Sequence, residues 1–381
     1  MNQNTIDFNA YQKIVIKIGS ALLVKNQQFS IQWLQSLADN INSLKKQNKQ
    51  IIIVTSGAVA LGKSLLQITQ SKISIPQKQA LASVGQIKLM SYYQQAFANH
   101  QQQVAQILVT ANDCNIRNSY LNCANTISTL LENNIIPIIN ENDSIATQEI
   151  KFGDNDRLAS RIAQMINADL LILFSDIDGL YDKNPKTHND AVFISQVSKI
   201  TSQIEDMATD TSSKVGTGGM ITKIMAAKMA MQSHCSTIIT NGENIDCLQK
   251  LWQNKQPFTH FIANEKVKKD HKKSKSKTNW LTGIVNPKGE IIINDCAVEA
   301  LKKGGVSLLP IGAVAVKGNF FSQDPVLVKD GNNNIIASGI INHGSADVAK
   351  ILQKTSQQVQ KILGNKCKTE LIHIDNLVMQ R

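Results

Sequence analysis

Several apolar runs of this sequence are each followed at once by a cluster of polar residues. Lys17 and Gly19 lie at the end of the run KIVIKI, and Ser56-Gly57 follows the run IIIVT. The cluster NEND, which ends at Asp143, follows IIPII, and the pair Ser175-Asp176 follows LLILF. If these runs are parallel strands of an open sheet, their carboxyl ends share the edge at which such sheets bind ligands. The pattern therefore predicts one crevice lined by lysine, amide, hydroxyl and carboxylate groups.

Two glycine-containing segments next to predicted helices fit the same crevice. GDND at 153–156 precedes one helix, and VGTGGM at 215–220 precedes another that carries Lys223 in its first turn. Where glycine stands at a helix start, backbone N–H groups can approach a phosphate, and the helix dipole adds positive potential. Lys17, Gly19, Lys223 and the glycine turn are therefore candidate phosphate-binding groups.

Asp143, Asn155 and Asp156 are the amide and carboxylate groups expected to face these phosphate-binding groups. Each residue also has a purely structural interpretation. Asp and Asn before a helix are commonly N-cap or turn residues, and a lysine at a strand end or on an amphipathic helix is commonly solvated. These alternatives stay open for each residue taken singly, but they do not predict that all of the polar groups follow strands on the same side.

A competing nucleotide motif is present at residues 57–64. GAVALGKS matches the GxxxxGK[ST] pattern of a P-loop and follows a strand, while LLILFSD, ending at Asp176, imitates the apolar run and aspartate of a P-loop magnesium site. A P-loop NTPase is therefore an alternative function. Against it, Ala58 to Leu61 are good helix formers, which predicts that Lys63 lies a turn into a helix and not in a phosphate-wrapping loop.

Alternating strands and helices predict a parallel sheet covered by helices on its faces. The predicted strands begin at Lys13, Ile51, Val104, Ile135, Leu170 and Thr237. The predicted helices lie near residues 31–46, 58–67, 77–98, 118–132, 155–167 and 219–233. Pro137 within the fourth strand is a mild objection, because proline cannot donate a ladder hydrogen bond.

The pattern changes after about residue 262 and predicts a second, mainly β domain. Residues 265–277 (EKVKKDHKKSKSK) hold seven lysines and carry +5 of the net charge of +11. Glycine-punctuated strands then begin at Glu290, Ala313, Val326 and Asn334, followed by a helical segment near 345–363 and a strand-like tail, ELIHI. The sequence thus predicts a first domain over 1–262, a basic linker over 263–279 and a second domain over 280–381.

Composition limits the classes of protein to which the chain can belong. Its 381 residues are 42% hydrophobic and 18% charged, which excludes a wholly disordered chain. No signal-like or membrane-spanning apolar stretch is present, so a cytoplasmic protein is expected. The six cysteines form no CxxC pair and are expected to be reduced, buried thiols.

Six ordered motifs resemble those of the γ-glutamyl kinases (glutamate 5-kinases) within the amino acid kinase family. They are IVIKIGSALL, IIIVTSGAVALG, PIINENDSIAT, KFGDNDRLAS, LFSDIDGLYDKNP and VGTGGMITK, and they span nearly all of residues 11–262. The second domain, with NWLTG, GGVSLLPIG and VKGNF, resembles a PUA domain, a module that binds RNA in other proteins. The resemblance implies a three-layer αβα sandwich, the amino acid kinase fold, followed by a small PUA domain.

The resemblance implies that ATP phosphorylates the side-chain carboxylate of L-glutamate, with Mg²⁺, as the first step of proline biosynthesis. At matching positions, Lys17 and Lys223 would flank the phosphoryl group and Asp156 would organise both lysines. The residues implied to hold glutamate are Ser56, Gly57, Asp143 and Asn155. The residues implied to bind the nucleotide are Lys17, Gly19, Ser175, Asp176, Thr217, Gly218, Gly219, Met220, Ile221, Thr222 and Lys223. No residue is assigned as a metal ligand.

The resemblance also implies partners for the protein. Proline is the expected feedback inhibitor, and a homo-oligomer is expected. Because an acyl phosphate product is destroyed by water, transfer to glutamyl phosphate reductase is plausible. RNA binding through the basic linker and the PUA domain is a further alternative, although charge runs are more often solvated tethers. No membrane partner is expected.

Overall fold

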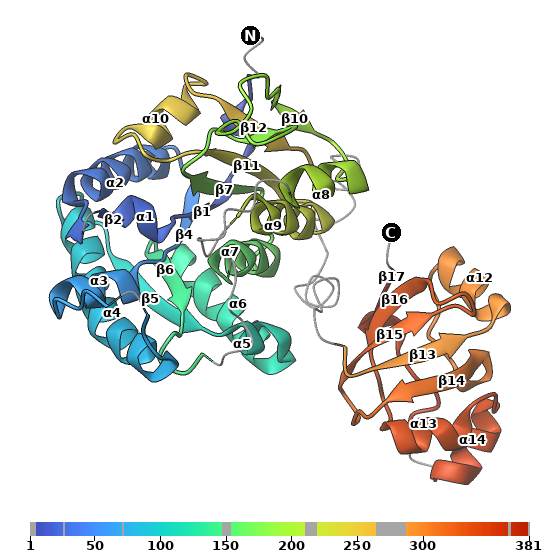
Figure 1. Cartoon of the computed structure of the whole chain (residues 1–381). Coiled ribbons are helices and arrows are strands. Elements are labelled where there is room, and N and C mark those ends of the chain that lie inside the picture. The colour runs from blue at the N-terminus through green and yellow to red at the C-terminus, as the bar shows by residue number, and fades with distance from the viewer. Residues whose placement is uncertain are drawn as a thin grey trace. The chain divides into compact units, whose positions relative to one another are not determined.

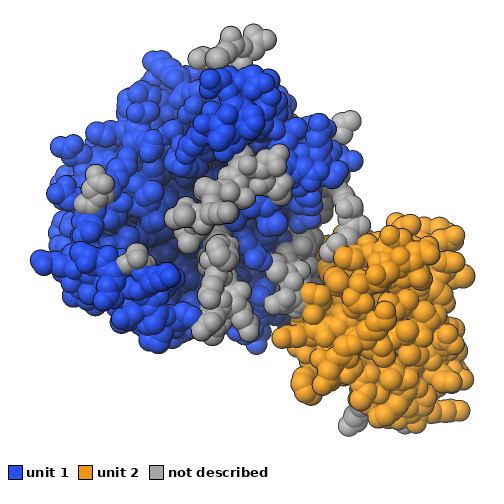
Figure 2. Space-filling view, viewed as in Figure 1, with its two compact units in different colours: residues 1–272 blue, residues 273–381 orange. Residues whose placement is uncertain are grey.

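The computed structural model describes residues 5–25, 27–70, 72–146, 154–209, 219–263, 287–364 and 367–379. The chain forms two compact units, residues 1–272 and residues 273–381, which Figure 2 shows in different colours. The division falls inside the stretch 264–286, so most of the linker expected at 263–279 lies outside the described residues.

Unit 1 is built on an eight-stranded sheet with the strand order β10-β12-β11-β7-β1-β4-β6-β5. The strands are β1 (Lys13–Lys17), β4 (Gln50–Val54), β5 (Val104–Val109), β6 (Ile136–Glu141), β7 (Leu170–Ser175), β10 (Gln196–Val197), β11 (Ser236–Asn241) and β12 (Phe258–Phe261). All neighbouring pairs are parallel except β11 and β12. The six strands predicted from the sequence are confirmed, and their shared direction places their carboxyl ends at one edge.

Helices cover both faces of this sheet, so the unit is a three-layer αβα sandwich (Figure 1). One face carries α2 (Ile31–Lys46), α3 (Ala58–Leu65), α4 (Ile75–Ala98) and α10 (Cys247–Trp252). The other face carries α6 (Arg117–Glu132), α7 (Asp154–Met165), α8 (Ser202–Thr209) and α9 (Met220–Gln232). The six predicted helices are confirmed to within a few residues at each end.

The helices form because apolar residues recur on one side of each. In α2 the buried residues are Trp33, Leu34, Leu37, Ala38, Ile41 and Leu44. This spacing of three and four residues lines one helical face, which packs on the sheet. Helix α4 begins with a capping box in which Ser74 and Gln77 bind each other's backbone N–H groups, and Pro76 lies in its first turn.

Pro137 fits in β6 because no neighbouring strand would accept a backbone hydrogen bond at its position on the β4 side. The backbone N–H of Ile136 points to the β5 side, where it donates to Gln103 O, so the next residue faces β4. Strand β4 pairs with β6 only at Ile138 and Ile139, beyond the proline. The objection that this proline raised against the strand is therefore wrong.

Shorter elements complete unit 1. They are α1 (Ser20–Leu23), α5 (Ala111–Asn115), the pair β2 (Val24–Lys25) and β3 (Gln28–Phe29), the pair β8 (Leu180–Tyr181) and β9 (Phe193–Ile194), and a 3₁₀ turn at Phe8–Ala10. None was predicted, because elements of a few residues have too few positions for periodicity to be recognised.

The described part of unit 2 contains a five-stranded sheet, with the order β14-β13-β15-β16-β17, and three α-helices. Its elements are β13 (Gly289–Ile293), α12 (Asp295–Lys303), β14 (Ala313–Gly318), β15 (Pro325–Lys329), β16 (Ile335–Ile340), α13 (Ser345–Ile351), α14 (Ser356–Leu363) and β17 (Leu377–Met379). The four predicted strands are confirmed, but the helical segment near 345–363 is two helices. The expected strand ELIHI is wrong: only Ile372 makes a bridge, to Leu308, and β17 lies further on.

All six cysteines are free thiols, but only Cys114, Cys235 and Cys247 are buried. Cys296 is exposed, so the expectation that every thiol is buried is wrong for that residue. Among the described residues, no helix is both long enough and apolar enough to cross a lipid bilayer.

Candidate active site

The carboxyl edge of the sheet in unit 1 has a switch point next to β1. From β1 the chain moves to β4 on one side, and from β6 it returns through α7 to β7 on the other side. In open α/β sheets this reversal leaves a crevice at the carboxyl ends of the strands. Lys17 is the last residue of β1 and Ser175 the last of β7, so both lie at this crevice.

Asp156 in the first turn of α7 binds two lysines from distant parts of the chain. Lys17 Nζ lies 2.6 Å from Asp156 Oδ1, and Lys223 Nζ, from α9, lies 3.4 Å from Oδ2. Thr222 Oγ1 also donates to Oδ2, at 2.8 Å. The approach of Lys17 is that of an ion pair, without the angle of a well-aligned hydrogen bond. The structure therefore brings together the two lysines that the sequence predicted to share a site.

This cluster is almost completely withdrawn from water. The side chain of Asp156 is 1% exposed, that of Lys223 6% and that of Lys17 10%. Burial opposes ionisation of Asp156, but the two ammonium groups and the hydrogen bonds outweigh it and lower the carboxyl pKa to about 2. Burial also lowers the pKa of Lys223, although Asp156 counteracts that effect. Two cations facing one anion leave excess positive charge, which an anionic ligand can neutralise.

Asn155, next to Asp156, connects α7 to the ends of two strands. Its Nδ2 donates to Thr55 O at 2.8 Å and to Ser56 Oγ at 2.5 Å, both just after β4. It also lies 3.2 Å from Oδ1 of Asn140, near the end of β6. Gly57 follows in the left-handed conformation, with φ of 103°, as the N-cap of α3. The two neighbouring residues of α7 therefore hold both the lysines and the predicted substrate-binding loop.

Among the described residues, little crowds the two glycines that precede α1 and α9. A Cβ added to Gly19 would meet Lys17 Nζ at 3.8 Å, and one added to Gly219 would meet nothing closer than 4.0 Å. Gly219 is the N-cap of α9, and Met220, Ile221 and Thr222 form its first turn. Thr217 and Gly218 lie outside the described residues. A phosphate at this helix start would meet backbone N–H groups of the first turn and the positive end of the helix dipole.

Ser175 and Asp176 lie after β7, as predicted, but they are less enclosed. Ser175 Oγ donates to Asp176 Oδ1 at 3.2 Å, and Lys186 lies 3.5 Å from Oδ2. The Asp176 side chain is 65% exposed. Burial raises the pKa of this carboxyl, but its own backbone N–H, Lys186 and Ser175 together lower it.

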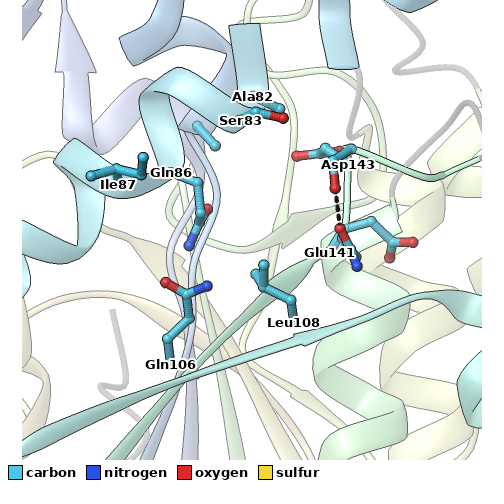
Figure 3. A pocket seen from close by; sticks show the side chains of 11 residues that line it. Ala82, Ser83, Gln86, Ile87, Gln106, Leu108, Glu141 and Asp143 are labelled. Atoms are coloured by element: carbon cyan, nitrogen blue, oxygen red, sulfur yellow. Dashed lines mark hydrogen bonds between the residues drawn. The ribbon is translucent and has the colours of Figure 1, made fainter. Parts of the chain in front are cut away.

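Asp143 lies apart from the lysine cluster, at a cavity of about 240 Å³ between α3, α4 and the ends of β5 and β6. Figure 3 shows this cavity with Gln86 from α4, Gln106 and Leu108 from β5, and Asp143 around it. Gln86 was not predicted as a site residue. One glutamine on a helix looks like any solvated residue in sequence, and only its burial, at 8% exposed, distinguishes it.

The P-loop alternative is wrong. Residues 58–65 form the helix α3, so Gly62 and Lys63 lie inside a helix, as their helix-forming neighbours predicted. A Cβ at Gly62 would lie 2.0 Å from Leu81 O, so this glycine allows close packing of α3 on α4. Lys63 Nζ donates to Gln70 O at the surface.

The fold and the site define an α/β protein whose buried lysines are arranged to bind an anionic group such as a phosphate. The sequence profile of the amino acid kinase family matches residues 12–241, and that of the PUA domain matches residues 289–363. The chain belongs to the amino acid kinase family. The glutamate 5-kinase of Paramagnetospirillum magneticum is 41% identical over 373 residues, which cover 97% of this chain and 98% of that protein. The glutamate 5-kinase of Pelagibacter ubique is 43% identical over 366 residues, covering 96% and 97%.

Proposed function

We propose that the chain is a glutamate 5-kinase, which transfers the γ-phosphoryl group of ATP to the side-chain carboxylate of L-glutamate in proline biosynthesis. The observation that carries this proposal is the buried Lys17–Asp156–Lys223 cluster at the carboxyl edge of the sheet. Relatives named glutamate 5-kinase that match nearly the whole chain support the choice of substrate.

The two lysines act on the transferred phosphoryl group. Phosphoryl transfer needs little covalent help from a protein, and it is accelerated mainly by positioning and by charge stabilisation. Lys17 and Lys223 supply positive charge from two directions, while Asp156 holds both ammonium groups in place. Because burial makes rearrangement of these groups costly, the positive charge is preorganised before the reaction.

The reaction requires no general base. A glutamate side chain has a pKa of about 4.3, so it is an ionised nucleophile at neutral pH. What hinders its attack is repulsion between two anions, which the lysines relieve. Asn155 and Ser56, which are joined by a hydrogen bond next to Asp156, position the amino acid.

The residues present fit ATP and Mg²⁺. Bound ATP would supply the phosphoryl group, and Mg²⁺ would neutralise negative charge on its phosphates. Gly19, Gly219 and the first turn of α9 offer open space and backbone N–H groups for phosphates, and Ser175 and Asp176 lie beside them at the end of β7. The described residues contain no group of three or more His, Cys, Asp or Glu that could hold a metal. Magnesium usually binds through substrate phosphates and few protein ligands, so these residues suit it.

Proline as feedback inhibitor, a homo-oligomeric assembly, a cytoplasmic location and transfer of the product to a reductase belong to the same proposal. Proline is proposed as an inhibitor because the cavity that Asp143 lines has a size that suits a small amino acid. RNA binding by the PUA unit stays a prediction.

The function is tested by trapping the acyl phosphate. The full chain is incubated with Mg-ATP, hydroxylamine and one of three acceptors, namely L-glutamate, L-aspartate or N-acetylglutamate. We expect hydroxamate with glutamate. A protein that is folded and binds ATP, but forms no hydroxamate with any acceptor, would reject the proposal. Product with aspartate or N-acetylglutamate alone would retain the reaction type and replace the substrate.

A further inference from the structure

Three side-chain amides form a continuous hydrogen-bonded relay from the lysine cluster to the cavity. Asn155 Nδ2 lies 3.2 Å from Asn140 Oδ1, and Asn140 Nδ2 donates to Gln86 Oε1 at 2.8 Å. Asn155 adjoins Asp156 at one end of the relay. Gln86 reaches the cavity beside Asp143 at the other end (Figure 3).

Two backbone groups fix the direction of the whole relay. Thr55 O can only accept, so Asn155 must turn its NH₂ group toward it. The N–H of Glu141 can only donate, so Asn140 must present Oδ1, which is 2.9 Å away. The NH₂ group of Asn140 then points at Gln86, which must accept this hydrogen bond through Oε1. A flipped amide at any step would set two donors or two acceptors against each other.

Gln86, a residue that lines the cavity, therefore keeps a hydrogen-bond donor, Nε2, for a further partner, and not an acceptor. This atom is buried and has no hydrogen-bond partner within the described part of the chain. Gln86 as a whole is 8% exposed, and Asn140, which fixes it, is 1% exposed. An unpaired buried donor is destabilising, and a carboxylate is the acceptor that compensates it best.

We infer that Gln86 Nε2 donates a hydrogen bond to the α-carboxylate of the amino-acid substrate, an inference that rests on the proposed function. The reacting carboxylate must lie near Lys17 and Lys223, at the opposite end of the relay from Gln86. The carboxylate at Gln86 is then the one that does not react. Asp143, at the same cavity, offers a carboxylate for the α-ammonium group of the same substrate. Gln86 is in this way a specificity-determining residue.

The experiment compares glutamate with its α-amide, L-isoglutamine, in the hydroxamate assay. Gln86→Glu keeps an oxygen for Asn140 and replaces the donor with a carboxylate. This variant repels an α-carboxylate but can accept a hydrogen bond from an α-amide. We expect the ratio of kcat/KM for glutamate to that for isoglutamine to fall by about tenfold to a hundredfold, the usual effect of one hydrogen bond to a charged group. Gln94→Glu, at an exposed glutamine of the same helix that does not line the cavity, is the matched control and should leave the ratio within about threefold.

A second variant covers the case in which Gln86→Glu does not fold. Gln86→Met should lower kcat/KM for glutamate at least about tenfold. It should leave turnover of 4-aminobutyrate, which lacks the α-carboxylate, within about threefold. Equal losses on both acceptors would show a merely structural role for Gln86 and overturn the inference. An unchanged glutamate-to-isoglutamine ratio in a folded Gln86→Glu variant would also overturn it. If the unmodified chain phosphorylates neither acceptor, the proposed function fails instead.

Discussion

Lys17 and Lys223 contact different oxygens of one carboxylate, that of Asp156. Lys17 is the last residue of the central strand β1, and Lys223 lies in the first turn of α9. The two lysines are therefore far apart in sequence. Because two ammonium groups face the one carboxylate of Asp156, an anionic ligand placed beside them would meet two positive charges. This relationship supplies the first two predictions.

Replacing either lysine should impair the chemical step more than binding. For Lys17→Ala and for Lys223→Ala we expect kcat to fall by about a hundredfold or more, because preorganised charge acts mainly in the transition state. KM for glutamate should change by less than about threefold. Steady-state kinetics of the hydroxamate reaction measure both constants. A large rise in KM with unchanged kcat would contradict the role given to the lysines.

Removing the shared carboxylate should cost stability as well as activity. Asp156→Asn removes the carboxylate that both buried ammonium groups contact, and we expect the free energy of unfolding to drop by about 3 kcal/mol or more. Urea denaturation measures the loss. Asp190→Asn, which removes the exposed partner of Lys183, should change stability much less, because solvent screens that pair. Equal effects of the two substitutions would mean that the buried cluster is not strongly coupled.

Lys63→Ala tests whether ATP binds at the lysine cluster or at the P-loop pattern. Lys63 Nζ donates to Gln70 O at the surface, so the variant should keep ATP turnover within about twofold. The same assay applied to Lys223→Ala should show a large loss. Abolished turnover in a folded Lys63→Ala protein would restore the P-loop alternative.

Gly85→Ala should destabilise unit 1. A Cβ at this position would lie 1.9 Å from Ala58 O and 2.6 Å from Gly62 N, both backbone atoms, so α3 and α4 must separate. We expect a loss of about 2 kcal/mol or more in unfolding free energy. Val84→Ala, an exposed neighbour on α4, is the control and should change stability much less. Separation of the helices would also disturb the loop at Ser56, so kcat/KM should fall with Gly85→Ala.

A buried histidine should give unit 1 a pH-dependent stability. Burial lowers the pKa of His260 from 6.5 to about 4, and its ring nitrogen Nε2 lies 3.3 Å from Tyr11 Oη. Between pH 6.5 and pH 4 the unfolded chain binds a proton that the folded chain does not, so the free energy of unfolding falls as the pH is lowered through this window. The contribution is fully present above pH 6.5 and amounts to about 3 kcal/mol.

Urea denaturation of the unmodified chain and of His260→Gln across this window measures the effect. The variant should lack this part of the pH dependence. Parallel curves for the two proteins would show that His260 is protonated equally in the folded and unfolded states.

The sequence by itself determined the main elements of both units. Six strands and six helices of unit 1 lie where the apolar runs and the helical periodicity predicted them, because each such pattern is local and spans many residues. The polar clusters after the strands also needed no tertiary information, since parallel strands carry the residues that follow them to one edge. Short elements such as α5 and α10 were missed because a few residues show no recognisable period.

Only the tertiary structure decided which of these residues touch. Nothing local shows that Asp156 binds Lys17 and Lys223, or that Asn155 bonds to Thr55 and Asn140, because these contacts depend on the order of strands in the sheet. Gln86 is the clearest case. Its sequence neighbourhood on α4 is that of an ordinary helix, and it becomes a directed donor only when the packing of α4 on β6 buries it against Asn140. Periodicity is a local property of the sequence, whereas the direction of a buried hydrogen bond is set by partners that folding brings together.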